Sequence, residues 1–298
     1  MVQAHHQQNR LQHPPQLRPR KKESNFKKVG GVFSYKKSAT ASWIKVNSPK
    51  FINVCATKFV GELFYSSKDA SLLMLLLQFS TSHYCRKARL ALGYKKISYQ
   101  VSNLTPGLHI LKLKPLTGLT TVPVLLPQVA GQVKAVADST NIFKFLESYC
   151  PQPALFLPNQ TQQTQAEMLE DWLDESIGTA TRFVYYHFRA RAGKAIDPSM
   201  FSQVLIQVVQ KQYGITDATA NLATQRLEIA LAELSRRWET SKYLVGELIS
   251  VADLTAAALL SPLALIPDYH QKYSWLFEQI KQIHLICGEP LPPGIAID

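Results

Sequence analysis

Residues 74–92 read MLLLQFSTSHYCRKARLAL, and this stretch is the most informative about the fold because its pattern predicts a strand directly before a helix. The apolar run 74–79 has the length of a strand, and the polar turn STSH at 80–83 follows it. Residues 84–92 have helical patterning, and Gly93 stands where a helix is expected to end. The stretch therefore predicts a strand, a tight turn and a helix in direct succession.

The sequence that follows adds three more strands and a second helix. We expect the strands at residues 96–101, 121–126 and 132–137, with a long connection after the first of them. The last two are close enough to form a hairpin around Gly131, and the helix begins at residue 138. This order of elements predicts a small α/β domain.

The remainder of the chain shows helical patterning and no convincing strand. Prolines at 151, 153 and 158 mark a linker. The segments with helical patterning are 161–191, 199–213, 217–240, 250–265 and 271–286. The sequence therefore predicts an α/β domain followed by an all-helical domain.

The composition of the 298 residues, 46% hydrophobic and 18% charged, is typical of a globular protein. The longest uncharged apolar-rich stretch, residues 254–266, is shorter than the roughly 20 residues of a membrane-spanning helix. The cysteines (Cys55, Cys85, Cys150 and Cys287) form no CxxC pair, and the histidines after residue 73 lack metal-ligand spacing. We therefore expect no membrane span, no disulfide scaffold and no metal site, and a reducing compartment is favoured.

The net charge of +12 is concentrated at the start of the chain. Residues 1–73 contain 13 Lys/Arg and 3 Asp/Glu, whereas residues 74–298 contain 20 and 18, so the second part is almost neutral. The basic extension 1–73 has three open interpretations: an organelle transit peptide, an arm that binds nucleic acid or a membrane surface, or upstream sequence that contributes nothing to the fold. In the last case translation would begin at Met74. A nucleic-acid function is not expected of the remainder.

Two further motifs have unusual local requirements. Pro123 lies within the apolar strand TVPVLL, although proline cannot donate to a sheet, so it needs an edge position or a special peptide bond. The segment SVAD at 250–253 has the pattern of a capping box, and Ile249 and Leu254 have the positions of a hydrophobic staple.

In this order, the motifs resemble the glutathione transferase family over residues 74–286. The resemblance implies a thioredoxin-like glutathione-binding domain at 74–153, an all-helical domain at 160–298 and a homodimer. The extension 1–73 lies outside the resemblance, and we expect it to be disordered.

The resemblance also implies roles for the turn after the first strand. Ser82 matches the residue that activates the glutathione sulfur. His83 stands where the family usually has proline, so Ser80 and Thr81 remain alternative sources of the hydroxyl. Ser82 can equally be an ordinary helix N-cap.

Glutathione itself is expected to bind along the strand and helix that follow. The Val122–Pro123 bond would be cis, so that Thr121, Val122 and Pro123 bind the cysteinyl part of the peptide. Asp138 would accept from the γ-glutamyl ammonium, and Ser139 would bind its carboxylate. A plain helix-capping pair is the alternative for these last two residues.

The expected activity is a cytoplasmic, detoxifying glutathione transferase that joins the glutathione thiolate to a small electrophile. An organelle is the alternative location if the extension is a transit peptide. Trp172, Phe183, Tyr185 and Tyr186 are candidates for the electrophile pocket, although aromatic residues at helical spacing are more often core. Two other functions stay open: a glutathione-fold binding module without catalysis, and a thiol-disulfide reductase that uses Cys85.

Overall fold

The computed structural model describes residues 74–128 and 132–296. The basic extension 1–73, with Cys55, and the expected hairpin tip at Gly131 lie outside the described residues. In the part that is described, no helix combines the length and apolar character needed to span a membrane.

A four-stranded sheet organises the first half of the described structure, with the strand order β2-β1-β3-β4. The strands are β1 (Met74–Gln78), β2 (Tyr99–Asn103), β3 (Val124–Leu126) and β4 (Val136–Ala137). β2 is parallel to β1, β3 is antiparallel to β1, and β4 is antiparallel to β3. The antiparallel pairing of β3 and β4 confirms that these strands form a hairpin.

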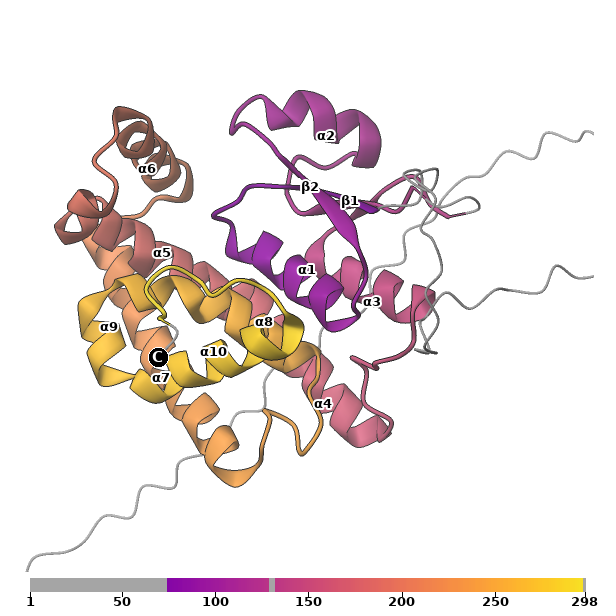
Figure 1. Cartoon of the computed structure of the whole chain (residues 1–298). Coiled ribbons are helices and arrows are strands. Elements are labelled where there is room, and N and C mark those ends of the chain that lie inside the picture. Colours follow the sequence, from indigo (N-terminus) through magenta and orange to yellow (C-terminus); the bar gives the residue numbers. More distant parts are fainter. Residues whose placement is uncertain (1–73, 129–131, 297–298) are drawn as a thin grey trace, which may run out of the picture. The chain divides into compact units, whose positions relative to one another are not determined.

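Helices cover both faces of this sheet. They are α1 (His83–Tyr94), α2 (His109–Thr117) and α3 (Ser139–Tyr149). Leu76 and Leu125 are buried in the same cluster as residues of α1 and α3. Leu77 and Val124, which alternate with them along the strands, are buried with Leu113 of α2. Figure 1 shows the result, with α2 on one side of the sheet and α1 and α3 on the other.

Helix α1 does not end at Gly93, so this part of the prediction was wrong. It continues to Tyr94, and Lys95 is its C-cap. A Cβ atom at Gly93 would lie 2.2 Å from the carbonyl oxygen of Cys287, in α10 (Ser274–Cys287). Glycine is required here because the two helices pass too closely for a side chain.

The long connection after β2 contains a helix that the sequence analysis missed. α2 includes residues 114–117 of the expected loop, with Pro115 inside it, and ends at Gly118 with a φ of 74°. Leu113 is its one buried residue, so α2 lacks the apolar stripe from which a helix is normally inferred.

The strands are also shorter or later than expected. β2 begins at Tyr99 rather than at residue 96, because Lys96 has a left-handed φ of 54°. β3 begins at Val124, after the proline, and β4 covers only Val136–Ala137.

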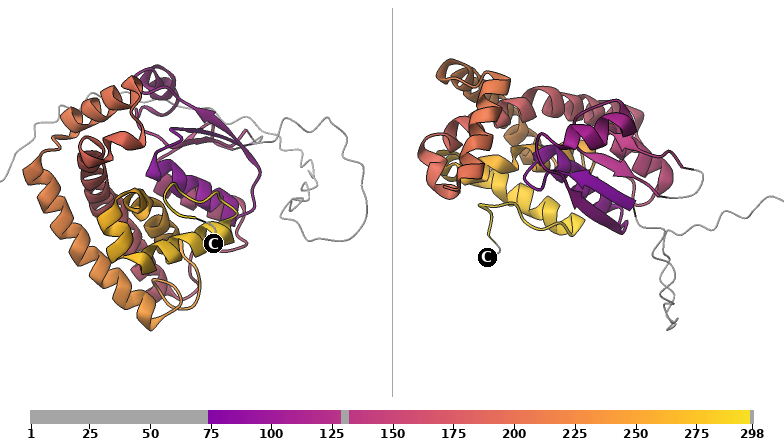
Figure 2. Two further views of the ribbon diagram at one scale, coloured as in Figure 1. Left: turned by 60° about the vertical axis from the view of Figure 1, so that its left-hand side comes forward. Right: turned by 90° about the horizontal axis from the view of Figure 1, so that it is seen from above.

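The second half of the described structure is helical, as predicted. Its elements before α10 are α4 (Gln160–Asp171), η1 (Trp172–Ile177), α5 (Gly178–Arg189), η2 (Ala192–Ile196), α6 (Met200–Tyr213), α7 (Asp217–Thr240), α8 (Val251–Leu260), η3 (Ser261–Leu265) and α9 (Pro267–Lys272). The π-helical turn η1 joins α4 to α5 within the helix expected over 161–191. α7 packs along α5, and Figure 2 shows this long orange helix in two orientations.

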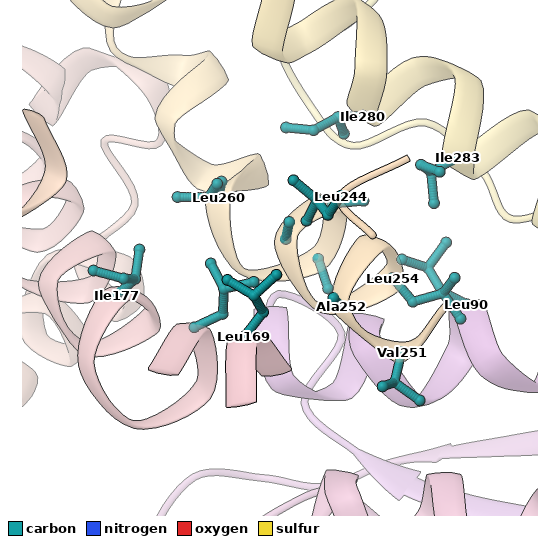
Figure 3. Packing of buried hydrophobic residues seen from close by; sticks show 14 of the residues in the cluster. Leu90, Leu169, Ile177, Leu244, Val251, Ala252, Leu254, Leu260, Ile280 and Ile283 are labelled. Atoms are coloured by element: carbon teal, nitrogen blue, oxygen red, sulfur yellow. The ribbon is translucent and has the colours of Figure 1, made fainter. Parts of the chain in front are cut away.

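Helix α8 lies between the two halves of the described structure, and every one of its residues is buried. It packs against α1, α4 and α10. Figure 3 shows Val251 and Leu254 of α8 near Leu90 of α1, in the same cluster as Leu169 of α4. Contacts of this apolar kind fix α1 against the helical elements.

The expected capping box begins α8. The N–H and Oγ of Ser250 donate to Asp253 Oδ2 at 2.9 and 2.8 Å, and the N–H of Leu244 donates to Oδ1 at 2.8 Å. Burial raises the pKa of Asp253 to about 6 although these bonds favour its ionised form. Ile249 and Leu254, the expected staple residues, are buried in the main core.

Candidate functional site

The sheet register brings three of the segments singled out in the sequence to one end of the sheet. Leu77 pairs with Val124, so β1 ends beside the start of β3. Val124 also pairs with Ala137, so β4 ends beside the same point. Because neighbouring strands are about 4.8 Å apart, the three segments fall within about 10 Å across the sheet. The turn after β1, Val122 before β3 and Asp138 after β4 therefore lie at a common edge.

Ser82 is the N-cap of α1, and its Oγ accepts a hydrogen bond from the N–H of Cys85 at 3.3 Å. A hydroxyl also has a hydrogen to donate, so this cap does not by itself occupy the hydrogen of Ser82. The N–H of Ser82 donates to the carbonyl oxygen of Phe79 at 3.1 Å, which closes the turn. Ser82 is half-buried, whereas Ser80 and Thr81 are exposed.

The Val122–Pro123 bond is cis, which confirms the expected geometry at this position. Pro123 is buried, Val122 is half-buried and Thr121 is exposed. Val122 packs against the cluster between the sheet and α2. Its backbone is therefore held at the edge where β1 ends.

Asp138 and Ser139 begin α3, as expected of a capping pair. Asp138 Oδ1 accepts from the N–H groups of Thr140 and Asn141, both at 3.0 Å. Both capping bonds use one carboxylate oxygen, and Ser139 is only 2% exposed. Asp138 has a φ of 77°, a left-handed value that costs a non-glycine residue about 1–3 kcal/mol. Strain of this kind gathers at functional sites, which motivates a role beyond capping.

A buried group of charged and polar residues, here called the lysine network, connects α1 to α3 and to the α4–η1 helix. It consists of Lys87, Thr140, Glu170 and Asp174. Lys87 Nζ donates to Asp174 Oδ1 at 2.7 Å, to Thr140 Oγ1 at 3.2 Å and to Glu170. Thr140 Oγ1 donates to Glu170 at 2.6 Å. The network therefore fixes the helix that Ser82 begins relative to the helix that Asp138 begins.

A pocket of about 250 Å³ lies beside the lysine network. It is lined by Thr140, Phe143, Lys144, Phe156, Glu167, Glu170, Asp171 and Val251. None of the site residues expected from the sequence is part of this lining.

On the other flank of α1, helix α5 presents four residues at i, i+3, i+4 and i+7, here called the arginine stripe. They are Arg182, Tyr185, Tyr186 and Arg189. The Arg182 guanidinium lies 5.3 Å from the ring centre of Tyr84, two residues after Ser82, and 4.6 Å from that of Tyr213 in α6. Gly178 permits this approach, since a Cβ there would lie 2.9 Å from the Tyr84 hydroxyl.

The four aromatic candidates for the electrophile pocket fall into two groups in the structure. Trp172 and Phe183 pack against the main core, as aromatic residues at helical spacing usually do. Tyr185 and Tyr186 are half-buried in the arginine stripe, and their ring centres lie 5.4 Å apart. Arg182 and Arg189 were missed, although their spacing around the two tyrosines could have found them.

Cys85 is fully buried in α1, as a cysteine that packs in a hydrophobic core is. Burial raises the pKa of its thiol, so the neutral form is favoured. Cys150 and Cys287 are also buried free thiols. Among residues 74–128 and 132–296, no three His, Cys, Asp or Glu side chains are grouped as metal ligands would be.

The fold and the edge of the sheet define a class of protein: a thioredoxin-like domain with a cis proline beside a helix N-terminus, followed by a helical domain. Residues 76–154 match the family model described as the glutathione S-transferase N-terminal domain. This match identifies residues 76–154 as a domain of the glutathione S-transferase N-terminal type. A search of curated proteins found no match.

Solved structures of similar fold include several glutathione transferases. One from Rhodospirillum rubrum F11 is 18% identical, with a TM-score of 0.56, and the match covers 71% of this chain and 88% of that one. One from Methylobacterium radiotolerans, in complex with glutathione sulfonate, is 20% identical, with a TM-score of 0.57 and coverage of 76% and 97%. The β-etherase LigF from Sphingobium sp. strain SYK-6 is 19% identical, with a TM-score of 0.57 and coverage of 71% and 94%. At these identities the likeness concerns the fold.

Proposed function

We propose that this chain catalyses the conjugation of the glutathione thiolate to a small electrophile. The observation that carries the proposal is the common edge where the turn of Ser82, the cis Val122–Pro123 bond and the strained Asp138 meet. In the proposal Val122 pairs with the cysteinyl backbone, with Thr121 and Pro123 beside it. Asp138 and Ser139 bind the γ-glutamyl end of the peptide.

Ser82 would hold the glutathione sulfur in its ionised form. A free cysteine thiol has a pKa of about 8.5, and lowering it by two units needs about 2.7 kcal/mol. A helix N-terminus contributes about 0.3–1 kcal/mol, which is not enough. A hydrogen bond from the Ser82 hydroxyl to the charged sulfur would add about 1.5–3 kcal/mol. The two effects together suffice without a protein base.

The reaction is a substitution in which the thiolate supplies the electron pair. With a chlorinated nitroaromatic compound, the sulfur attacks the carbon that bears chlorine and a C–S bond forms. The C–Cl bond then breaks, and chloride leaves with its electron pair. The thiol proton has passed to solvent before the attack.

The test is the substitution Ser82→Ala in the full chain, assayed with glutathione and chlorodinitrobenzene. We expect turnover to fall tenfold or more, about 1.4 kcal/mol, and the pH profile to move upward because the thiol pKa is no longer lowered. Ser82→Gly removes the hydroxyl with little loss of capping, so it should show the same kinetic defect without a stability defect.

Ser80→Ala and Thr81→Ala are the matched controls, since both residues are exposed in the same turn. We expect each to leave turnover within about twofold, which corresponds to less than 0.5 kcal/mol. Loss of turnover in one of them, with Ser82→Ala still active, would move the activating role to that residue.

The other two functions become outcomes of the same experiment. Retention on immobilised glutathione without turnover would favour a binding module. Rapid alkylation of Cys85 in the native protein would favour a thiol-disulfide reductase. We expect slow alkylation, because this thiol is buried.

The proposal also includes the domain bounds, the location, the oligomeric state and the biological role expected from the sequence. They are a glutathione-binding domain at 74–153, a helical domain at 160–298, a cytoplasmic homodimer and a role in detoxification. The molar mass of the full chain in solution tests the dimer.

A further inference from the structure

The flank of α1 that faces α5 contains buried arginines that form no ion pair within the described residues. Arg86 and Arg189 are each 8% exposed, and Arg182 is half-buried. None of the three forms an ion pair with a carboxylate in the part of the chain that the structure describes. Buried arginine is rare unless it is paired, because removing the charge from water is costly.

The neutral partners of these arginines do not balance their charge. Arg86 donates to the hydroxyl of Ser261, and Arg189 donates to the Tyr185 hydroxyl at 2.9 Å and to Ser202 at 3.3 Å. The Nε of Arg189 is buried and has no hydrogen-bond partner in the described ranges 74–128 and 132–296.

The carboxylates nearest to this flank already have other partners. Asp174 accepts from Lys87, and Glu289 from Arg89. Asp197 accepts from the N–H of Ser199 before α6, and hydrogen bonds from Ser199, with a smaller contribution from the charge of Arg189, lower its pKa, although the two side chains form no ion pair. Within the described residues, Arg86, Arg182 and Arg189 are therefore left without a carboxylate in ion-pair contact.

Part of this charge lies near the first turn of α1, on the opposite flank of the helix from Asp138. Arg182 contacts the ring of Tyr84, two residues from Ser82. The lysine network and Asp138 lie on the side of α1 that faces α3. A tripeptide that binds between Ser82 and Asp138 leaves the arginine stripe to the second substrate.

We propose that the arginine stripe binds an anionic group of the electrophile, so that the preferred second substrates are aromatic carboxylates or sulfonates. The inference rests on the proposed conjugation and names its substrate class. Arg182 contacts the anion, and Tyr185 and Tyr186 supply aromatic surface for the ring. Arg86 and Arg189 are positioning residues that raise the local positive potential.

Equilibrium binding tests the proposal without requiring turnover. Dinitrobenzoate and dinitrobenzamide have nearly the same shape, and only the first is charged. We expect the full chain to bind the benzoate at least tenfold more tightly in calorimetric titrations, as a charged hydrogen bond allows. Arg182→Gln should remove this preference. Arg236→Gln, which deletes an exposed guanidinium of α7, should keep it.

Turnover provides the second measurement, with chlorodinitrobenzoate and chlorodinitrobenzamide corrected for their uncatalysed rates. We expect the ratio of their kcat/KM values to favour the benzoate, and to fall at least tenfold in Arg182→Gln but not in Arg236→Gln. The loss should appear mainly in KM, because the anion is bound equally before and during the reaction.

The outcomes separate this inference from the proposed function. Turnover of both compounds without preference for the benzoate overturns the anion site and leaves the conjugation standing. Tight benzoate binding that Arg182→Gln abolishes, without turnover of either compound, supports the anion site and contradicts the conjugation. Weaker glutathione binding in Arg182→Gln with an unaltered ratio would assign the stripe to the tripeptide and overturn the inference.

Discussion

Arg86 and Lys87 are consecutive residues of α1, and both are buried, but their surroundings differ in charge. Lys87 meets Glu170 and Asp174, so its charge is compensated inside the protein. Arg86 meets the hydroxyl of Ser261 and no carboxylate within the described residues. The difference suggests that the flank toward α3 and α4 is built for stability, whereas the flank toward α5 keeps its positive charge for a ligand.

The largest expected difference in stability comes from removing each of these two charges by the same substitution. Lys87→Met leaves two carboxylates buried without a cation, so we expect the free energy of unfolding to fall by about 3–5 kcal/mol. Arg86→Met removes a buried charge that has no ionic partner, and we expect a change within about 1.5 kcal/mol in either direction. Urea unfolding measures both, and equal losses in the two variants would contradict the comparison.

Two buried histidines near Arg86, His83 of α1 and His284 of α10, should make stability depend on pH. Burial, followed by the charges of Arg182 and Arg86, lowers the pKa of His83 to about 3. Burial, followed by the charge of Arg86, lowers that of His284 to about 4. Unfolded histidine has a pKa near 6.5, so only the unfolded chain takes up these protons as the pH falls. The stabilising contribution is present above pH 6.5 and is lost toward pH 4 and below.

We expect each of these histidines to add a slope of up to about 1.4 kcal/mol per pH unit in this window. Asp253 acts in the opposite direction, since its raised pKa favours the folded state below about pH 4 and this contribution is lost as the pH rises through 6. The informative quantity is therefore the difference in slope between wild type and His83→Gln or His284→Gln. Slopes that stay the same in both variants would show that these side chains titrate normally.

The smallest expected effect separates capping from ligand binding at Asp138. Asp138→Ala should lose about 1 kcal/mol of stability because the cap of α3 disappears, whereas Asp138→Asn retains a capping oxygen. Both variants lose the negative charge, and we expect glutathione affinity to fall about tenfold in each. Calorimetric titration with glutathione measures the affinity. An Asp138→Asn protein that binds glutathione like wild type would reduce this residue to a cap.

Local patterns predicted much of the fold. The run of residues 74–92 gave the strand, turn and helix, and the SVAD motif gave the start of α8, because each depends on neighbours in the chain. Helix α2 was missed since it buries only Leu113, and Gly93 was misread since its partner, Cys287, is far away in the sequence.

For the candidate site, too, short motifs were predictable from the sequence, whereas contacts between distant residues were not. Ser82, the cis Val122–Pro123 bond and the Asp138-Ser139 pair are short motifs, so a resemblance over short segments could point to them. The arginine stripe could be seen in the sequence only as an amphipathic spacing. That its charges are unpaired depends on which carboxylates of other helices lie nearby.

The chain's own sequence thus determined its strands, most of its helices and the residues that cap them, since hydrogen bonds between near neighbours and apolar periodicity act over a few residues. Which buried charges are balanced depends on how the helices are arranged in space. Lys87 pairs with Glu170 and Asp174, which lie more than eighty residues away in the sequence, whereas Arg86 beside it pairs with no carboxylate among the residues that the structure describes. Electrostatic compensation is a property of distances in space, and adjacent residues on a helix face different neighbours.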